Sequence, residues 1–329
     1  MQMTNVPVSV VMSVKNGLPY IGETIQSVLK QSFSAFEFVI IDDGSTDKTI
    51  DAIKAFHDPR IKLITQENTG VATAKNRAIM ASIGKYIAII DADDICLPNR
   101  LEQQYNFLEA HPDHVLVGGF VDIIDKDGNY LYTEKKPIED QDIRKHQDQR
   151  NPWSHSSVMF SREAFDAVGG YYEPVQQYIV DYMLLYQLSK QGKVHQLPQV
   201  VVQYRIVPTA LSAKANPKEF DEITHRAIRA GKMSEADLAA MLRIKQKEKS
   251  TANFKKSMYH LYLGRSFIFH RFNRQKAQEH LKACLSLNPS LKVARYYLWM
   301  TRLLPASLIK LIYRLLSPNA GLTYVRDND

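Results

Sequence analysis

Short apolar runs rich in β-branched residues alternate with segments of helical periodicity along the first 205 residues. The runs expected to form strands lie at 8–14, 36–42, 61–65 and 86–91. The segments expected to form helices, with apolar residues three or four positions apart, lie at 20–30, 46–56, 69–82 and 99–110. Ser45 or Thr46 is the expected cap of the second of these helices. This β-α-β-α order predicts an α/β fold with a mostly parallel central sheet between helices.

Beyond residue 115 the alternation loosens, but no Pro- or Gly-rich linker interrupts it. Strand-like pieces at 115–121, 156–160 and 200–204 mix with helical pieces at 161–168 and 179–191. We interpret this part as the second half of one domain that spans residues 1–212. Residues 213–329 have a helical and basic pattern, which predicts a separate α-helical C-terminal region.

The net charge of +7 conceals an asymmetry between these two parts. Residues 211–329 contain 22 Lys and Arg but 9 Asp and Glu, a net of +13, which leaves −6 for the remainder. A strongly basic region is typical of one that faces an anionic partner. Two cysteines, Cys96 and Cys284, exclude a disulfide framework and fit a reducing compartment. No signal peptide or membrane-spanning helix is expected from the pattern.

Two interpretations stay open for each half of the basic region. Ala277, Leu281, Cys284 and Pro289 match the second half of a tetratricopeptide repeat, but an ordinary helix ended at Pro289 explains them equally well. Residues 296–316 suit a pair of amphipathic helices, broken at Pro305, that lies in a membrane interface beside anionic lipid. The alternative is a helix packed on the main domain with a solvated basic face.

Acidic residues gather where the predicted parallel strands end, which is where open α/β sheets bind ligands. Asp42 and Asp43 end the second strand, and Asp91, Asp93 and Asp94 follow the fourth. Several anions at one edge repel each other, and a divalent cation relieves that repulsion. Oxygen ligands of this kind select Mg²⁺ or Mn²⁺, which complete their shells with waters and substrate phosphates.

The Asp91-Ala92-Asp93 segment is expected to be extended, so that its two carboxylates point along the same side of the chain. A purely structural interpretation, in which Asp91 or Asp94 caps a turn, competes with the metal site. A dinucleotide fold and a P-loop are disfavoured because GxGxxG and GxxxxGK[ST] are both absent. Phosphate recognition is therefore expected to depend on the metal.

Asp181 stands in apolar, helical surroundings in YIVDYMLLYQL. At the start of a helix an Asp is usually a cap, but an Asp among apolar residues can also be a general base.

Taken together, these segments resemble the family 2 glycosyltransferases of the GT-A fold. The resemblance covers residues 7–205 and rests on an ordered series of motifs: VSVVMSVKNGLPYIGETIQSVLKQ, FEFVIIDDGSTDKT, RIKLITQENTGVATAKNRAI, GKYIAIIDADD and VDYMLLYQLSKQGKVHQLP. It implies a GT-A domain that moves a sugar from a nucleotide diphosphate donor to an acceptor hydroxyl and inverts the anomeric centre. The cofactor implied is Mn²⁺ or Mg²⁺.

The resemblance also implies roles for the acidic residues. Asp91-Ala92-Asp93 matches the DXD motif, in which Asp93 binds the metal on the diphosphate and Asp91 contacts the ribose or sugar. One of Asp42 and Asp43, with Asp43 preferred, accepts a hydrogen bond from the base, typically from N3–H of uracil.

Other residues are assigned by their place in the matched motifs. Ser13, Val14 and Lys15 match the segment that lies against the nucleotide. Asp181 matches the general base, and the resemblance favours this role over that of a cap.

Some positions depart from the family pattern. Lys75 stands where Arg is usual, so a point charge replaces a bidentate fork in the nucleotide contacts. Val180 precedes Asp181 where Glu is common, and Val207 follows the matched region where His is frequent. His155 lies where members place residues that contact the acceptor, although a hydrogen-bonded core histidine is the favoured interpretation.

The expected partners follow from this resemblance and from the charge. They are a nucleotide-sugar donor, most simply a UDP-sugar, and a glycan or lipid-linked acceptor in surface polysaccharide synthesis. The expected location is the cytoplasm, peripheral on the inner surface of the membrane, and a homo-oligomer is left open. Three alternatives compete: a non-catalytic assembly subunit of the same fold, a nucleotidyltransferase, and nucleic-acid binding by the basic region. The aromatic residues of that region have helical spacing typical of core, so no nucleic acid is expected.

Overall fold

The computed structural model describes residues 6–176, 179–208, 218–247, 251–305, 307–309, 311, 313 and 323–324. The chain forms two compact units. The sheet unit comprises Met1–Val121, Lys136–Gln203 and Pro217–Ile244, and the helical unit comprises Asp122–Lys135, Tyr204–Asn216 and Lys245–Asp329.

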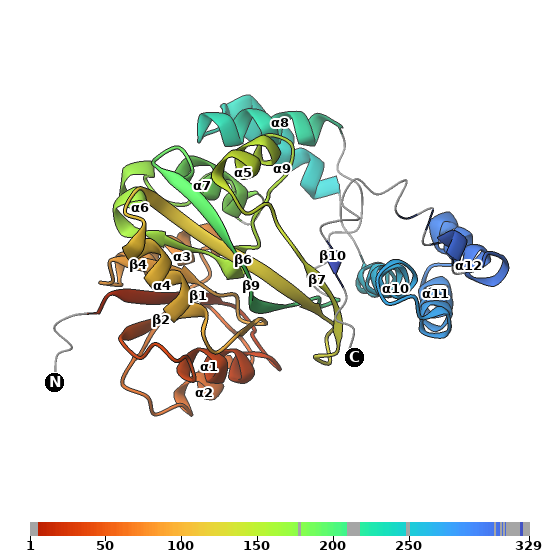
Figure 1. Ribbon diagram of the computed structural model, residues 1–329, viewed down its shortest axis with the longest axis horizontal. Coiled ribbons are helices and arrows are strands. Elements are labelled where there is room, and N and C mark those ends of the chain that lie inside the picture. Colours follow the sequence, from red (N-terminus) through yellow and green to blue (C-terminus); the bar gives the residue numbers. More distant parts are fainter. Residues whose placement is uncertain are drawn as a thin grey trace. The chain divides into compact units, whose positions relative to one another are not determined.

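Four parallel strands form the centre of the sheet unit (Figure 1). They are β1 (Val8–Val14), β2 (Phe36–Asp43), β3 (Ile61–Gln66) and β4 (Tyr86–Ile89), in the order β4-β1-β2-β3. The helices that connect them or follow β4 are α1 (Ile21–Leu29), α2 (Thr49–Lys54), α3 (Val71–Met80) and α4 (Arg100–Ala110). The predicted α/β fold with a parallel centre is thereby confirmed.

The predicted cap of α2 is wrong. The helix begins at Thr49, and neither Ser45 nor Thr46 caps it. Lys48 is the N-cap residue and makes no side-chain capping bond, and Oδ1 of Asp47, just before it, accepts hydrogen bonds from the Thr49 amide at 3.0 Å and the Thr49 hydroxyl at 2.5 Å. Ser45 and Thr46 instead bond to Asn16 in the loop after β1.

Beyond β4 the sheet continues with antiparallel strands. β8 (Met159–Ser161) pairs with β4, and β6 (His114–Ile124) pairs with β8. β9 (Lys193–Arg205) pairs with β6 and with the two-residue β5 (Ile95–Cys96). The helices of this part are α5 (Asp140–Gln147), α6 (Arg162–Val168) and α7 (Val180–Leu188).

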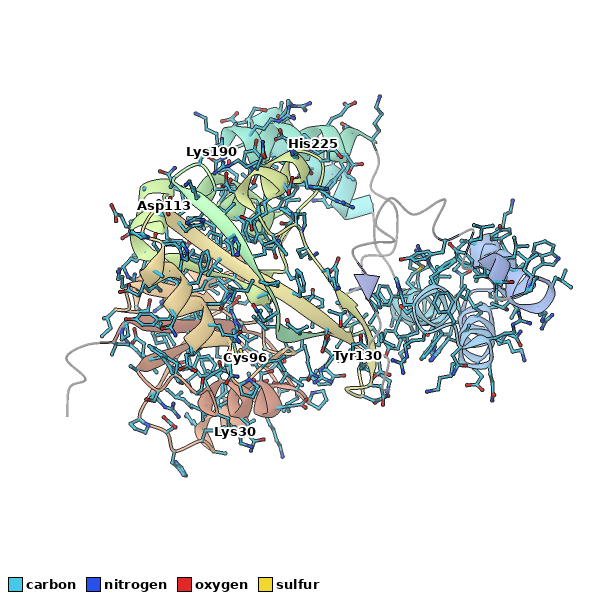
Figure 2. The ribbon with its side chains drawn as sticks, in the orientation of Figure 1. Lys30, Cys96, Asp113, Tyr130, Lys190 and His225 are labelled. Carbon is cyan, nitrogen blue, oxygen red and sulfur yellow. The ribbon has the colours of Figure 1, made fainter. Side chains whose placement is uncertain are left out.

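One buried arginine holds this junction of strands together. The Arg100 guanidinium is 1% exposed and donates to the carbonyls of Ile89 at 2.8 Å and Val158 at 3.0 Å. It also contacts the Cys96 sulfur at 3.2 Å. Burial raises the pKa of the Cys96 thiol, against the lowering effect of Arg100. The Cys96 label in Figure 2 marks this region of the sheet unit.

One helix after residue 212 and most of a second belong to the sheet unit, although the sequence places a domain boundary there. α8 (Lys218–Ala230) buries Phe220, Ile223, Ala227 and Ile228, and α9 begins at Glu235 and ends at Lys247. Seven of the nine residues of α7 are buried, so this helix needs apolar cover on more than one side. Figure 1 shows α8 beside α7, and Gln187 of α7 donates to the Ile228 carbonyl. A functional division at residue 212 stays a prediction.

The helical unit contains α10 (Ala252–Phe269), α11 (Arg274–Leu287) and α12 (Lys292–Leu303). It also contains β7 (Tyr130–Glu134), which pairs antiparallel with β10 (Thr323–Tyr324). α10 and α11 pack closely at Gly264, where an added Cβ would lie 2.9 Å from the Leu281 side chain.

Ala277, Leu281 and Cys284 are all fully buried, as both interpretations of this segment require. The helix break predicted at Pro305 is confirmed, since α12 ends at Leu303. Part of the predicted second helix, at 306, 310, 312 and 314–316, lies outside the described residues. In the part of the chain that the structure describes, no helix is both long and apolar enough to cross a membrane.

Candidate functional site

The carboxyl ends of β1, β2 and β4 lie at one edge of the parallel sheet, as predicted. The register of β1 and β4 pairs Val11 with Ile89, two residues before Ser13 and Asp91, and the register of β1 and β2 pairs Val14 with Asp42. The Ser13 hydroxyl is buried and makes no hydrogen bond to any described residue. Lys15, two residues further, is exposed. This edge therefore collects polar side chains from three strands.

Hydrogen bonds join the loop after β1 to the loop after β2. The Asn16 amide donates to the Ser45 hydroxyl, and the Thr46 amide donates to Asn16 Oδ1, both at 2.8 Å. Asn16 has a φ of +56°, a left-handed conformation that asparagine adopts more readily than most residues. The Gly17 amide donates to the Thr49 hydroxyl at 2.8 Å. The two loops thus form one rigid rim beside the strand ends.

Asp42 and Asp43 are both buried, but their carboxylates are used differently. Asp43 Oδ1 accepts from Gln66 at 2.7 Å and from the Thr69 amide at 2.8 Å, and Oδ2 accepts from the Gly70 amide at 3.0 Å. Burial alone would raise the pKa of Asp43, but these hydrogen bonds outweigh it and hold the pKa below its usual value. Asp43 therefore fixes the loop between β3 and α3.

The Asp42 carboxylate has one oxygen that accepts no hydrogen bond from a described residue. Its Oδ1 accepts from the Ser45 amide at 3.0 Å, whereas its Oδ2 is buried without a hydrogen-bond partner among the described residues. An unpaired buried acceptor costs about 1–3 kcal/mol, and more when it is charged. A ligand that donates to this oxygen would recover that cost.

Lys75 and Asp91 form an ion pair at the strand ends, in which the lysine is buried and the Asp91 side chain is 33% exposed. The Lys75 ammonium, on α3, is 5% exposed and lies 2.8 Å from Asp91 Oδ1 and 3.0 Å from His155 Nδ1. Burial opposes ionisation of Asp91, but the Lys75 charge outweighs it and holds the pKa of Asp91 well below its usual range. Asp91 is thus an anion at neutral pH, and its first oxygen is occupied by Lys75.

His155 and Tyr171 extend this pair into a chain of hydrogen bonds. An ammonium can only donate, so Nδ1 of His155 accepts from Lys75 and its Nε2–H donates to the Tyr171 hydroxyl at 2.9 Å. The preferred interpretation of His155 as a hydrogen-bonded core histidine is confirmed, and its partners also tie it to the site. Burial and the charges of Asp91 and Asp181 raise the pKa of Tyr171 well above 10.

Tyr171 was not singled out in the sequence. Its amide donates to the Asn76 side chain at 2.8 Å, and the preceding Gly170 has a φ of +83°. An added Cβ on Gly170 would lie 2.7 Å from Asn76 Oδ1, so this turn needs glycine. The Gly169-Gly170 pair before two tyrosines is the one signal that points to a constrained loop here.

The predicted extended conformation of Asp91-Ala92-Asp93 is wrong. β4 ends at Ile89, and Ala92 and Asp93 form a turn in which the Asp94 amide donates to the Asp91 carbonyl at 3.3 Å. Arg100 explains the early end, because it occupies the Ile89 carbonyl that a longer strand would use for pairing. The Ala92 carbonyl accepts from Thr24 of α1 at 3.0 Å, which fixes the turn.

Asp93 is half-buried in this turn. No group of three or more His, Cys, Asp or Glu side chains that could hold a metal exists among the described residues. A metal at this edge would therefore take most of its ligands from substrate and water, which suits Mg²⁺ and Mn²⁺. The chemistry of the donor set fits one carboxylate from the protein, and Asp93 stays the predicted ligand.

Asp181 lies in the first turn of α7, whose N-cap residue is Ile179. Its role as a general base stays a prediction. The side-chain Nδ2 of Asn151 donates to Asp181 Oδ2 at 3.4 Å.

The sequence of residues 9–169 matches the family described as "Glycosyl transferase family 2". Among curated relatives, GlyG of Streptococcus pneumoniae, a glycosyltransferase, is 35% identical over 128 residues, which are 38% of this chain and 42% of GlyG. The amylovoran biosynthesis glycosyltransferase AmsE of Erwinia amylovora is 28% identical over 187 residues, which are 56% of this chain and 69% of AmsE. The match thus spans less than half the length of GlyG.

Two solved structures share the fold at low identity. TarS 1–349 of S. aureus in complex with UDP-GlcNAc aligns with a TM-score of 0.55 and 18% identity, covering 94% of this chain and 91% of TarS 1–349. The mannosyltransferase PcManGT of Pyrobaculum calidifontis, in complex with GDP-Man and Mn²⁺, aligns with a TM-score of 0.53 and 18% identity. That alignment covers 96% of this chain and 89% of PcManGT.

Proposed function

We propose that this chain, which matches glycosyl transferase family 2 over residues 9–169, is a glycosyltransferase that moves a sugar from a nucleotide diphosphate donor to a hydroxyl group with inversion. The sheet unit has the GT-A architecture. The observation that carries the proposal is the convergence of Ser13, Asp42, Asp91 and Asp93 on one edge of the parallel strands. Two of these residues, Ser13 and Asp42, hold buried polar atoms without a hydrogen-bond partner among the described residues.

The nucleotide binds along the ends of β1 and β2 in this proposal. Ser13, Val14 and Lys15 lie against it, and Lys15 is exposed there. We assign the base contact to Asp42 in place of Asp43, because Asp42 Oδ2 lacks a hydrogen-bond donor among the described residues and Asp43 is used by the loop at 66–70. UDP-GlcNAc in TarS and GDP-Man in PcManGT support a nucleotide-sugar donor, and we propose a UDP-sugar.

Asp93 holds the divalent metal in this proposal, and Asp91 with Ala92 contacts the ribose or the sugar. Lys75, expected at the nucleotide, acts through Asp91, which it keeps ionised and in place. His155 and Tyr171 are positioning residues for that pair. When bound, Mn²⁺ or Mg²⁺ supplies positive charge to the departing diphosphate. The Mn²⁺ of the PcManGT complex supports a metal of this class.

Asp181 is the general base in this proposal. It accepts the proton of the incoming acceptor hydroxyl, and an inverting single displacement needs no second carboxylate as nucleophile. It lies in the first turn of α7, and the hydrogen bond that its carboxylate accepts from Asn151 Nδ2 is long at 3.4 Å, which leaves the carboxylate able to accept a proton.

The acceptor is a glycan or a lipid-linked sugar in our proposal, and the sugar is a hexose or an N-acetylhexosamine. The name of AmsE, an amylovoran biosynthesis glycosyltransferase, supports a role in surface polysaccharide synthesis. We place the enzyme at the cytoplasmic face of the membrane, where its basic C-terminal region meets anionic lipid. The alternative is a non-catalytic subunit of the same fold, which the presence of Asp43, Asp91, Asp93 and Asp181 argues against.

The deciding experiment is donor turnover. The purified protein with Mn²⁺ or Mg²⁺ is offered UDP-, GDP- and dTDP-sugars, and release of the nucleoside diphosphate is measured. We expect slow, metal-dependent cleavage of one donor, lost in Asp93→Ala. Titration calorimetry with the matching nucleoside diphosphate, with and without metal, gives a second readout. The absence of metal-dependent nucleotide binding would contradict the enzyme and leave the non-catalytic subunit.

A further inference from the structure

The solvent side of α12 carries large apolar side chains that the fold does not need. Tyr296, Trp299 and Leu303 are 54%, 51% and 63% exposed, and they recur at spacings of three and four residues, which aligns them on one face of the helix. The rings of Tyr296 and Trp299 stack with centroids 6.1 Å apart. Single exposed apolar residues are ordinary, but an aligned row of three is a surface feature.

The opposite side of α12 packs inside the helical unit. Ala294, Met300 and Thr301 are buried, and Gln278 of α11 donates to the Thr301 carbonyl at 3.3 Å. Arg274 donates to the Leu304 carbonyl at 2.7 Å and so fixes the end of the helix. The row at 296–303 therefore has to face away from α10 and α11.

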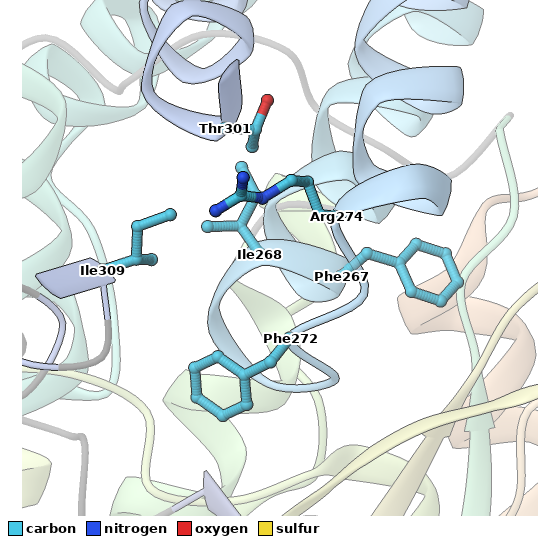
Figure 3. A pocket seen from close by; sticks show the side chains of 6 residues that line it. All are labelled: Phe267, Ile268, Phe272, Arg274, Thr301 and Ile309. Carbon is cyan, nitrogen blue, oxygen red and sulfur yellow. The ribbon is translucent and has the colours of Figure 1, made fainter. Parts of the chain in front are cut away.

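A small apolar hollow lies where α10, α12 and the segment after Pro305 pack together. Figure 3 shows its six lining residues: Phe267, Ile268, Phe272, Arg274, Thr301 and Ile309. Its volume is 20 Å³, space for about one water molecule, so it is a packing seam and not a ligand site. Ile309, from the segment after Pro305, is buried beside it.

Positive charge surrounds the apolar row. Lys292 and Arg295 lie on the exposed side of α12, and Arg302 lies in its last turn. Residues 280–326 contain seven Lys and Arg and no Asp or Glu. Tyr and Trp favour the boundary between water and lipid, where basic side chains can also meet headgroups. Two copies of this surface would repel each other, which disfavours self-association through it.

We propose that this face of α12, formed by Lys292, Arg295, Tyr296, Trp299, Arg302 and Leu303, binds an anionic lipid surface. We call it the α12 face. The proposal deepens the membrane location proposed above and rests on that location for its purpose, but its observations are independent of catalysis. Leu303 and the two aromatic rings enter the interface, and the three basic side chains contact lipid phosphates.

The test is sedimentation of the full-length protein with vesicles. Phosphatidylcholine vesicles are compared with vesicles that also contain phosphatidylglycerol, at low and high salt. We expect binding to the anionic vesicles only, weakened by salt. In Arg295→Gln/Arg302→Gln we expect the apparent affinity to fall about 30-fold, from two charges near the surface. Trp299→Ser/Leu303→Ser removes the apolar contact, and we expect a loss of at least tenfold.

Met80→Ser/Ile83→Ser is the matched control, because these side chains are 81% and 66% exposed in the sheet unit. Vesicle binding equal to that of the unchanged protein is expected for this control. Circular dichroism of each variant shows that it has folded. In a Trp153→Phe background, Trp299 is the single tryptophan, and its emission shifts to the blue on binding if the α12 face enters the lipid.

Several outcomes would contradict the proposal that the α12 face binds lipid. They are equal binding to neutral vesicles, no binding to anionic vesicles, and binding that the variants leave unchanged. A dimer that becomes monomeric in Trp299→Ser/Leu303→Ser would instead assign the face to a second copy. Donor cleavage measured without vesicles separates the two proposals. Cleavage without lipid binding would contradict the lipid-binding proposal alone. Lipid binding without nucleotide binding would contradict the proposed function alone.

Discussion

The sheet unit and the helical unit depart from the rule of apolar inside and polar outside in opposite directions. The sheet unit buries charged residues at the ends of its parallel strands, among them Asp42, Asp43 and Lys75. The helical unit exposes Tyr296 and Trp299 to water. A buried polar group and an exposed apolar row are the two informative kinds of exception, since apolar burial itself is general. The first kind indicates a polar ligand, and the second indicates an apolar surface.

The largest effect is expected at Asp181, where chemistry and stability separate. Asp181→Asn keeps the shape of the side chain but removes the base. We expect kcat to fall about 10² to 10⁴-fold while donor affinity and thermal stability stay unchanged. Stopped assays with excess acceptor, and nucleotide titration in parallel, check this. An equal loss in donor affinity would mean that Asp181 belongs to the donor site.

The next largest effect is expected on the stability of the helical unit at acidic pH. His270 stacks on Tyr132 with ring centroids 4.0 Å apart, and burial, aided by the Arg265 charge, lowers the pKa of His270 to about 4. The unfolded chain takes up this proton near pH 6.5 and the folded chain does so only near 4. The stability is therefore complete above pH 6.5 and lost as the pH falls toward 4, by roughly 3 kcal/mol.

Each unit contains one tryptophan, Trp153 in the sheet unit and Trp299 in the helical unit. Urea unfolding of Trp153→Phe reports on the helical unit, and unfolding of Trp299→Phe reports on the sheet unit. The free energy of unfolding measured by Trp299 fluorescence is expected to fall between pH 7 and pH 4.5. His270→Gln should reduce that fall. A transition of Trp299 that does not depend on pH in this range would refute the prediction.

A smaller, later loss is expected at Asp43 in the sheet unit. Its folded pKa lies below the unfolded value of 3.8, so its contribution is complete above that value and is lost as the pH falls below it. Asp43→Asn should cost about 1–3 kcal/mol at pH 7, because one donor at 66–70 loses its acceptor. The difference from the unchanged protein should shrink near pH 3. Chemical unfolding of both proteins in the Trp299→Phe background measures this, and a difference that is constant with pH would contradict it.

The smallest effect is expected at Tyr171, which acts on Asp91 through His155 and Lys75. Tyr171→Phe removes one hydrogen bond and keeps the ring, so we expect a rise in donor KM of less than tenfold with little change in kcat. His155→Asn should act in the same direction. Tyr172→Phe, at the neighbouring position, is the control. A fall in kcat alone would place Tyr171 in contact with the reacting atoms.

The parallel part of the sheet was predictable from the sequence because its strands are short segments rich in apolar and β-branched residues. β1, β2 and β4 begin at the expected residues, and the strand ends meet as parallel topology requires. The turn at Asp91 was not predictable. It depends on Arg100, which bonds Ile89 and Val158, and a buried guanidinium looks like any other helix residue in the sequence.

The site was predictable where it follows strand ends and hidden where it depends on distant contacts. Asp42 and Asp91 were found by position. The different use of Asp43 appears only in its hydrogen bonds, one of which comes from the Thr69 amide, 26 positions away. Tyr171 is one of 17 tyrosines, and its partner Asn76 is 95 positions away. No local pattern encodes a contact of that length.

The order of segments in the sheet unit has a consequence for synthesis on the ribosome. α7 ends at Leu188, and α8, which covers it, ends at Ala230. At ordinary translation rates the ribosome needs roughly 2–8 seconds to make the intervening residues. During that interval the apolar side chains of α7 lack their native cover, although β1 to β4 have already been synthesised. A nascent chain halted between these two points is the form of this protein that we expect a chaperone to bind.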